Sequence, residues 1–405
     1  MTTRPFDEER DVKAIEQIWR EVGWITSDES VKALKDMLSV GRCLCGLLDG
    51  EVEAVAHSTP GFMHYDGSEL PLCAVTGVTV SRVARKQGFA ARLTAESLAL
   101  GAADGAAVAS LGMFEQGFYD RVGFGTGSYE HRLHFDPSSL SVSDKPRPPR
   151  RLTAKDWKAV HQALVARMRH HGSVTLTPAR SVRAQLLFVS DPWGLGYFEG
   201  DELTHFVFGS AKGENGPYWI ETYAYRNLEQ LMELLALIKS LGDQVRSIGM
   251  FEPPHIQLQT LINKPFRRQM TTKRSDFELS HESSAWWQLR ILDLPACMAA
   301  RHWGGRPIEF NLTLTDPVSA LPDSQWAGIG GEYSITVAED SSASPGHRDG
   351  LPEMRSDVNT FSRLWMGISP ASSLAYTGNL NADPELLREL DAAFLLPAAQ
   401  PTWYY

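Results

Sequence analysis

Residues 85–90, Arg-Lys-Gln-Gly-Phe-Ala, form a basic turn between an apolar run and a helical pattern. The apolar run at residues 78–80 (Val-Thr-Val) has the composition of a strand, and the apolar positions after the turn recur at helical spacing. A helix N-terminus presents free backbone N–H groups and the positive end of its dipole, so it can bind phosphate. Gly88 lets the backbone approach such a ligand, and Arg85 and Lys86 add positive charge. The turn is therefore a candidate phosphate site, with an ordinary strand-to-helix connection as the alternative.

The spacing of this turn excludes two common nucleotide loops. A P-loop requires GxxxxGK[ST], and the dinucleotide fingerprint requires three glycines before the helix. Residues 123–127 are rich in glycine, but a polar strand pattern follows them rather than a helix. We interpret residues 123–127 as a turn.

Two tyrosines could carry proton transfer. Tyr119 lies in an aromatic segment, and Tyr405 ends the chain after Trp403 and Tyr404. A tyrosine hydroxyl, with an ordinary pKa of about 10, can act as a proton donor, and an α-carboxylate can act as a proton acceptor. The alternatives are that Tyr119 is a packed core residue and that the terminal carboxylate only anchors the tail. We expect the aromatic terminus to be docked in either case.

The histidines and cysteines do not predict a metal site. Glu130, His131 and His134 lie on a probable strand, where residues three apart face opposite sides. The four cysteines are too few and too irregularly spaced for a disulfide framework. We therefore expect no bound metal and no disulfides.

The composition limits the possible classes of protein. A length of 405 residues suggests two or three domains, and a net charge of −10 argues against nonspecific binding to nucleic acid. No run approaches 18 apolar residues, and the first residues lack the apolar core of a secretory signal, so we expect a cytoplasmic protein without a membrane span.

The apolar periodicity predicts three segments of mixed secondary structure, which is an α+β fold class with mixed sheets. The first segment reads as two helices, the second capped by Asp28, then a hairpin at Asp49-Gly50, a strand, a helix and two more strands. A proline-rich stretch at residues 141–150 predicts a linker. The second segment loosely repeats this order without the basic turn. The third predicts strands at 307–316 and 331–340, a polar loop at 341–357 and two helices.

Two motifs together resemble the Gcn5-related N-acetyltransferases (GNATs). In that superfamily a Val-x-Val strand is followed by [QR]-x-x-G-x-[GA] at the start of a helix, which residues 78–80 and 85–90 match. Its F-Y-x-x-x-G-F motif matches residues 118–124. The whole chain resembles the Eis (enhanced intracellular survival) family, although residues 289–301 and the aromatic terminus are the less specific part of that likeness. The resemblance implies a catalytic GNAT domain at 1–140, a second, degenerate GNAT-like domain at 150–284, and a sterol-carrier-protein-like domain at 285–405.

The resemblance also implies acetyl transfer from acetyl-CoA to a primary amine on an aminoglycoside, a polyamine or a lysine-like acceptor, without a metal. It makes Tyr119 the general acid and the C-terminal carboxylate of Tyr405 the general base. It further suggests a homo-oligomer, with hexamers as the family precedent. The residues implied to bind the cofactor are Val78, Thr79, Val80, Arg85, Lys86, Gln87, Gly88, Phe89, Ala90, Ala91, Phe114 and Glu115.

Trp24 and Asp28 are further candidates for contact with the acceptor, although a tryptophan after a helix is more often a core residue. Two readings without catalysis remain open. The chain could be a regulatory protein that binds coenzyme A, or its last domain could carry a lipid.

Overall fold

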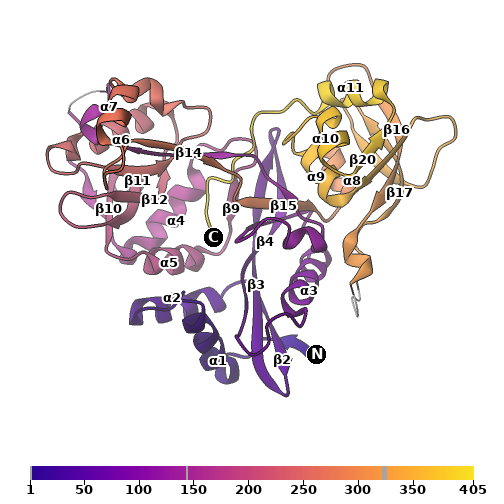
Figure 1. Ribbon diagram of the computed structural model, residues 1–405, viewed down its shortest axis with the longest axis horizontal. Coiled ribbons are helices and arrows are strands. Elements are labelled where there is room, and N and C mark those ends of the chain that lie inside the picture. Colours follow the sequence, from indigo (N-terminus) through magenta and orange to yellow (C-terminus); the bar gives the residue numbers. More distant parts are fainter. Residues whose placement is uncertain (1, 143–144, 322–325) are drawn as a thin grey trace.

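The computed structural model describes residues 2–142, 145–321 and 326–405, which form three mixed sheets flanked by helices (Figure 1). The first sheet has the strand order β1-β2-β3-β4-β5-β15-β6, and β9 pairs with β3. Helix α3 (Phe89–Ala103) packs on this sheet, together with α1 (Glu8–Glu21) and α2 (Asp28–Leu38). The strands of this sheet are β1 (Thr2–Pro5), β2 (Arg42–Leu48), β3 (Glu51–Tyr65), β4 (Ser68–Val80), β5 (Val108–Gly112), β6 (Gly125–Thr126), β9 (Val174–Leu176) and β15 (Trp287–Ile291).

The second sheet has the order β14-β7-β13-β12-β11-β10-β8. Its helices are α4 (Trp157–Ala166), α5 (Ala179–Phe188), α6 (Leu228–Ser240) and α7 (Pro265–Thr272). Its strands are β7 (Glu130–Phe135), β8 (Arg150–Arg151), β10 (Pro192–Glu199), β11 (Glu202–Ala211), β12 (Tyr218–Ala224), β13 (Ile248–Phe251) and β14 (Ser280–Ser284).

The third sheet has the order β18-β17-β16-β19-β20. Helices α8 (Leu294–Ala299), α9 (Val358–Trp365), α10 (Ala371–Thr377) and α11 (Pro384–Ala393) accompany it. Its strands are β16 (Ile308–Thr315), β17 (Gly331–Val337), β18 (Ser342–Pro345), β19 (Glu353–Asp357) and β20 (Leu380–Ala382). The combination of mixed sheets and separate helices confirms the predicted α+β class.

The first and second sheets exchange strands. β7, from the first segment of the sequence, lies between β14 and β13 of the second sheet. β15, which follows the second segment, lies between β5 and β6 of the first sheet. The predicted domain boundaries stay predictions, but the sheets themselves interlock across them.

Capping residues set the helix starts near the site. Asp7 accepts a hydrogen bond from the Arg10 backbone and begins α1, whose apolar face buries Ile15 and Trp19. Ser27, not Asp28, caps α2 through the backbone N–H of Ser30, so the expectation for Asp28 was wrong. A carboxylate at the first helical position still interacts favourably with the dipole, which explains the similar sequence signal.

Two further expectations can be compared with the structure. The hairpin between β2 and β3 turns at Asp49 and Gly50, both with positive φ (51° and 88°), as predicted. The segment 341–357 was expected to be a loop, but it contains β18 and β19. Both strands are short and consist mostly of exposed residues, so their composition resembles a loop. None of the described helices is long and apolar enough to cross a membrane.

Candidate active site

The first sheet splits open between β4 and β5. Their parallel pairing covers only Leu72–Ala74 against Val108–Ser110, whereas β4 continues to Val80 paired with β3. Opposite Ala56, a bulge places two residues, Gly77 and Val78, against one, and Gly77 has a φ of 60°. The edge of residues 75–80 that faces away from β3 is therefore free to hydrogen-bond a ligand that enters the split.

The basic turn continues directly from this free edge. Gly88 has a φ of 83° and precedes α3, which has neither a side-chain cap nor an acidic residue in its first turn. Arg85, Lys86 and Gln87 are exposed, while Phe89 is buried and fixes the start of the helix in the core. The turn thus presents an uncapped helix N-terminus and two exposed cations, which suits a pyrophosphate.

Tyr119 lies at the start of a 3-10 helix (Tyr119–Val122) and packs in the core cluster that includes Val75, Leu98 and Leu111. Burial raises the pKa of Tyr119 to about 12. In the described parts of the chain, its hydroxyl has no hydrogen-bond partner. The Tyr119 hydroxyl is therefore protonated at neutral pH and remains available to a ligand.

Phe114 and Glu115 follow β5, on the other side of the split from the basic turn, and both are exposed. The Phe114 ring lies 5.1 Å from that of Phe118 and 6.1 Å from that of Tyr119, measured between centroids. One oxygen of the Glu115 carboxylate accepts a hydrogen bond from the Gln116 backbone. These residues border the same region as Tyr119.

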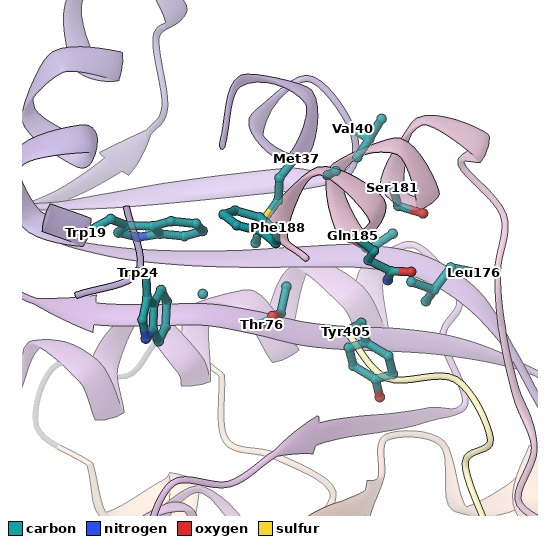
Figure 2. Close-up of a pocket in the computed structure, with 13 residues that line it drawn as sticks. Trp19, Trp24, Met37, Val40, Thr76, Leu176, Ser181, Gln185, Phe188 and Tyr405 are labelled. Atoms are coloured by element: carbon teal, nitrogen blue, oxygen red, sulfur yellow. The ribbon is translucent and has the colours of Figure 1, made fainter. Parts of the chain in front are cut away.

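A cavity of about 360 Å³ lies beside the bulge of β4 (Figure 2). Four aromatic side chains surround it, from α1, the turn after α1, α5 and the C-terminus: Trp19, Trp24, Phe188 and Tyr405. The Trp19 indole donates a hydrogen bond to the Thr79 hydroxyl at 3.1 Å, which fixes this wall to β4. The remaining lining residues are Met37, Val40, Thr59, Thr76, Gly77, Leu176, Ser181, Ala184 and Gln185.

The last residue crosses the split. Tyr405 lines the cavity beside Thr76 and Gly77 of β4, and its hydroxyl forms a hydrogen bond with Ser110 of β5. Burial raises the pKa of the Tyr405 hydroxyl well above its ordinary value. The C-terminus therefore bridges the two strands that separate at the site.

The rest of the tail is held by specific contacts. The Trp403 indole donates to the Gln185 side chain at 3.0 Å, and the Tyr404 hydroxyl donates to Glu130 at 3.1 Å. The Tyr404 ring stacks on Phe251 with centroids 4.4 Å apart. The aromatic terminus is docked, as expected.

Glu130 is the buried carboxylate beneath this tail. It is 3% exposed, and its Oε2 atom has no hydrogen-bond partner among the described residues. Burial raises its pKa to about 7, against the opposing effect of the hydrogen bond from Tyr404. The charge state of Glu130 thus changes near neutral pH.

The structure gathers most of the candidate residues around the split, but not all of them. Trp24 lines the cavity, whereas Asp28 is exposed at the start of α2 and is not part of the lining. Sequence reasoning missed the wall from α5, which includes Gln185 and Phe188, because the second segment supplies it to the first. It also missed Glu130 as a tail contact, because Glu130 lies on a largely polar strand (β7) in which a carboxylate gives no sign of burial.

Comparisons with known proteins agree with this geometry. Residues 4–127 match the acetyltransferase (GNAT) domain family, and residues 294–404 match the sterol carrier protein domain family. No curated protein is similar enough in sequence to match the chain.

Several solved structures share the whole fold. A probable N-acyltransferase from Enterococcus faecalis V583 has a TM-score of 0.78 at 16% identity, with 100% of this chain and 99% of that chain covered. A GCN5-related N-acetyltransferase from Kribbella flavida has a TM-score of 0.76 at 22% identity, with coverage of 100% and 98%. Eis1 from Mycobacterium abscessus has a TM-score of 0.76 at 19% identity, with both chains covered completely. The chain therefore joins a region that matches the acetyltransferase (GNAT) domain family, residues 4–127, to a region that matches the sterol carrier protein domain family, residues 294–404, and it shares its overall fold with Eis1.

Proposed function

We propose that the chain transfers acetyl from acetyl-CoA directly to a primary amine that is bound in the aromatic cavity. The observation that carries this proposal is that the cavity borders the free edge of β4 at Thr76 and Gly77. An amine in the cavity and a thioester along residues 78–80 would meet at this point. Direct transfer in a ternary complex requires this proximity.

The cofactor would lie along the split in the first sheet. The backbone of Val78–Val80 would bind the pantetheine arm and the thioester carbonyl, and a backbone N–H there would stabilise the developing oxyanion. Residues 85–91 would hold the pyrophosphate through Arg85, Lys86 and the start of α3. Phe114 and Glu115 would flank the arm from the β5 side. The fit rests on the unpaired edge of β4 and the uncapped helix.

Tyr119 would protonate the leaving thiolate. Its pKa of about 12 keeps the proton on the hydroxyl at neutral pH, and the hydroxyl has no competing partner in the described chain. The terminal carboxylate of Tyr405 would accept a proton from the bound ammonium group, which leaves the neutral amine that attacks the thioester. Asp and Glu are absent from the described lining of the cavity, so the tail would supply its carboxylate.

The lining also favours one class of acceptor. Aromatic and aliphatic side chains make up most of the walls, and the polar side chains among the described lining residues are uncharged. Desolvating each additional ammonium group there would cost several kcal/mol without a compensating carboxylate. We therefore favour a monoamine with an apolar body, or a lysine-like side chain, over polyamines and aminoglycosides.

The experiment is CoA release from acetyl-CoA across an amine panel of arylalkyl monoamines, lysine peptides, polyamines and aminoglycosides. The variants are Tyr119→Phe and a chain lacking Tyr405, with Tyr376→Phe, an exposed tyrosine on α10, as the matched control. Turnover that collapses in both site variants and persists in the control supports the two roles. Acetyl-CoA binding without turnover on the whole panel would instead favour a non-catalytic binding protein.

A homo-oligomer and a cytoplasmic location stay predictions. Sedimentation velocity of the full chain tests the first, and fractionation of the source cells tests the second.

A further inference from the structure

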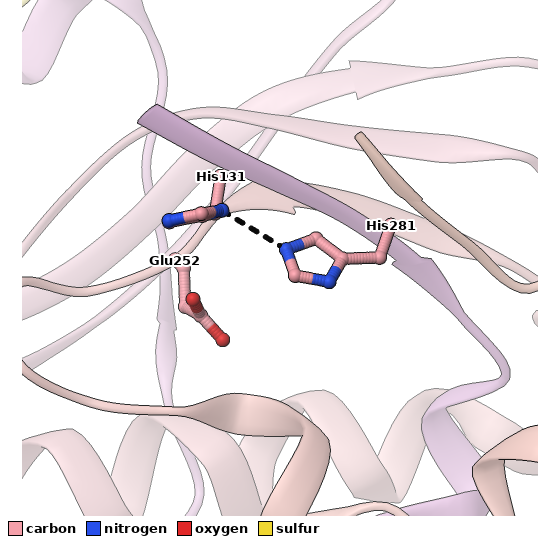
Figure 3. Close-up of side chains that lie close together, drawn as sticks. All are labelled: His131, Glu252 and His281. Atoms are coloured by element: carbon pink, nitrogen blue, oxygen red, sulfur yellow. Dashed lines mark hydrogen bonds between the residues drawn. The ribbon is translucent and has the colours of Figure 1, made fainter. Parts of the chain in front are cut away.

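Three potential metal ligands gather on one face of the second sheet, away from the cavity: His131, Glu252 and His281 (Figure 3). His131 lies on β7 and His281 on the neighbouring β14, where His281 pairs with Leu133, two residues from His131. Glu252 follows β13 directly, and its backbone N–H donates to the carbonyl of His131. The strand register therefore brings two imidazoles and one carboxylate together from three adjacent strands.

The distances suit a small divalent transition metal ion. His131 Nδ1 and His281 Nε2 lie 3.1 Å apart, and the ligand atoms of all three residues lie within 4.8 Å of one another. An ion bound at about 2.0–2.1 Å from each ligand in a tetrahedral arrangement needs ligand separations of roughly 3.3 Å. Small rotations would reach that value, because His281 is exposed and the other two side chains are half-buried.

The surroundings already orient the carboxylate. One oxygen of Glu252 accepts a hydrogen bond from the backbone N–H of Leu258 at 2.7 Å. Hydrogen bonds of this kind commonly hold metal-binding carboxylates in position. Arg132, the neighbouring cation on β7, lies over the Phe251 ring at 4.7 Å, on the opposite face of the strand. Its charge therefore does not occupy the space between the three ligands.

We propose that His131, Glu252 and His281 bind a divalent ion of the Zn²⁺ class, with the fourth position open to water. Two neutral imidazoles and a carboxylate are ligands that Zn²⁺, Co²⁺ and Ni²⁺ accept. Binding replaces the N–H···N hydrogen bond between the imidazoles. The ring that donated this bond loses the proton from its ligating nitrogen to solvent and takes one up on its other nitrogen, so both imidazoles remain neutral.

The bound ion would brace the strand exchange and the docked tail. It would tie β7, from the first segment, to β13 and β14 of the second. The preceding residues on two of these strands, Glu130 and Phe251, hold Tyr404. The ion is therefore structural, and it lies outside the chemistry of acetyl transfer.

The test uses the full-length chain without a histidine tag, after treatment with EDTA and buffer exchange. Zn²⁺ titration by calorimetry and Co²⁺ absorption spectroscopy measure stoichiometry and affinity. We expect one ion per chain, a tetrahedral Co²⁺ spectrum, and a rise in melting temperature with Zn²⁺. His281→Gln, on an exposed edge strand, should weaken binding about tenfold or more and abolish the rise.

His347→Gln is the matched control. His347 is an exposed histidine that contacts Glu353 and Asp349, but these three residues do not form a comparable ligand cluster within the described chain. It should bind Zn²⁺ and respond in melting temperature like the wild type. Absence of binding by the wild type, or equal binding by His281→Gln, would overturn the proposal.

Discussion

Replacing Glu130 with Gln should remove a pH dependence of stability that the buried carboxylate creates. Folding raises the pKa of Glu130 from its ordinary value of 4.5 to about 7. Below about pH 4.5 the group is neutral in both states, so burial carries no charge penalty. Between about pH 4.5 and 7 the unfolded chain is ionised while the folded chain still holds its proton, so stability falls as the pH rises; above about 7 both states are ionised and the loss is complete.

The size of the effect follows from the same values. A rise in pKa from 4.5 to about 7 corresponds to about 3 kcal/mol, lost between roughly pH 4.5 and pH 8. Near pH 5 Glu130→Gln should differ from the wild type by less than about 1 kcal/mol, because only the first part of the loss has occurred there. At pH 8 it should be more stable by up to about 3 kcal/mol, because no charge has to be buried.

Urea unfolding followed by tryptophan fluorescence, at pH values from 5 to 8, measures the difference. Release of the terminal residues by a carboxypeptidase at the same pH values reports the docking of the tail locally. Glu282→Gln is the control, because Glu282 is an exposed carboxylate on β14, which pairs with the strand of Glu130. The reasoning is refuted if Glu130→Gln keeps the wild-type slope, or if it is less stable than the wild type at pH 8.

Three further predictions concern the site and its support. Tyr119→Phe should lower kcat about 10²- to 10⁴-fold. The urea midpoint should stay nearly unchanged, because the hydroxyl has no partner in the described chain. Comparable losses in kcat and stability would point to a packing role. Gly88→Ala should lower the free energy of unfolding by about 1–2 kcal/mol, because the φ of 83° at this position is strained for alanine. It should also raise the KM for acetyl-CoA more than it lowers kcat, and an unchanged KM would contradict the role of the turn. Asp316→Asn should destabilise the chain by about 3–5 kcal/mol, because it leaves the fully buried Arg290 guanidinium without the carboxylate that lies 2.5 Å away; a urea midpoint equal to that of the wild type would contradict this.

The local parts of the site could be predicted from the sequence. The strand at 78–80, the glycine turn and the helix after it depend on neighbouring residues, and the structure places all three as expected. The docked terminus was also predictable, because an apolar tail of aromatic residues is costly to expose.

The remaining parts depend on contacts distant in sequence. Gln185 and Phe188 line the cavity through the packing of α5 against the first domain, and no local pattern encodes that docking. The contact between His131 and His281 depends on the pairing of two strands about 150 residues apart in the sequence. The spacing of the histidines within β7 alone therefore predicted no metal site. The expectation that Asp28 caps α2 was wrong because serine and aspartate are both common N-cap residues, and Ser27 and Asp28 are adjacent in the sequence.

The position of β15 between β5 and β6 affects the order in which the chain can fold during synthesis. Translation reaches β6 at residue 126, but the strand that fills the gap beside it begins at Trp287. At about 5–20 residues per second, the ribosome needs roughly 8–30 seconds to supply it. During that interval β5 presents an open edge beside the split of the candidate active site, and the first sheet cannot be completed until the second segment of the chain has been made.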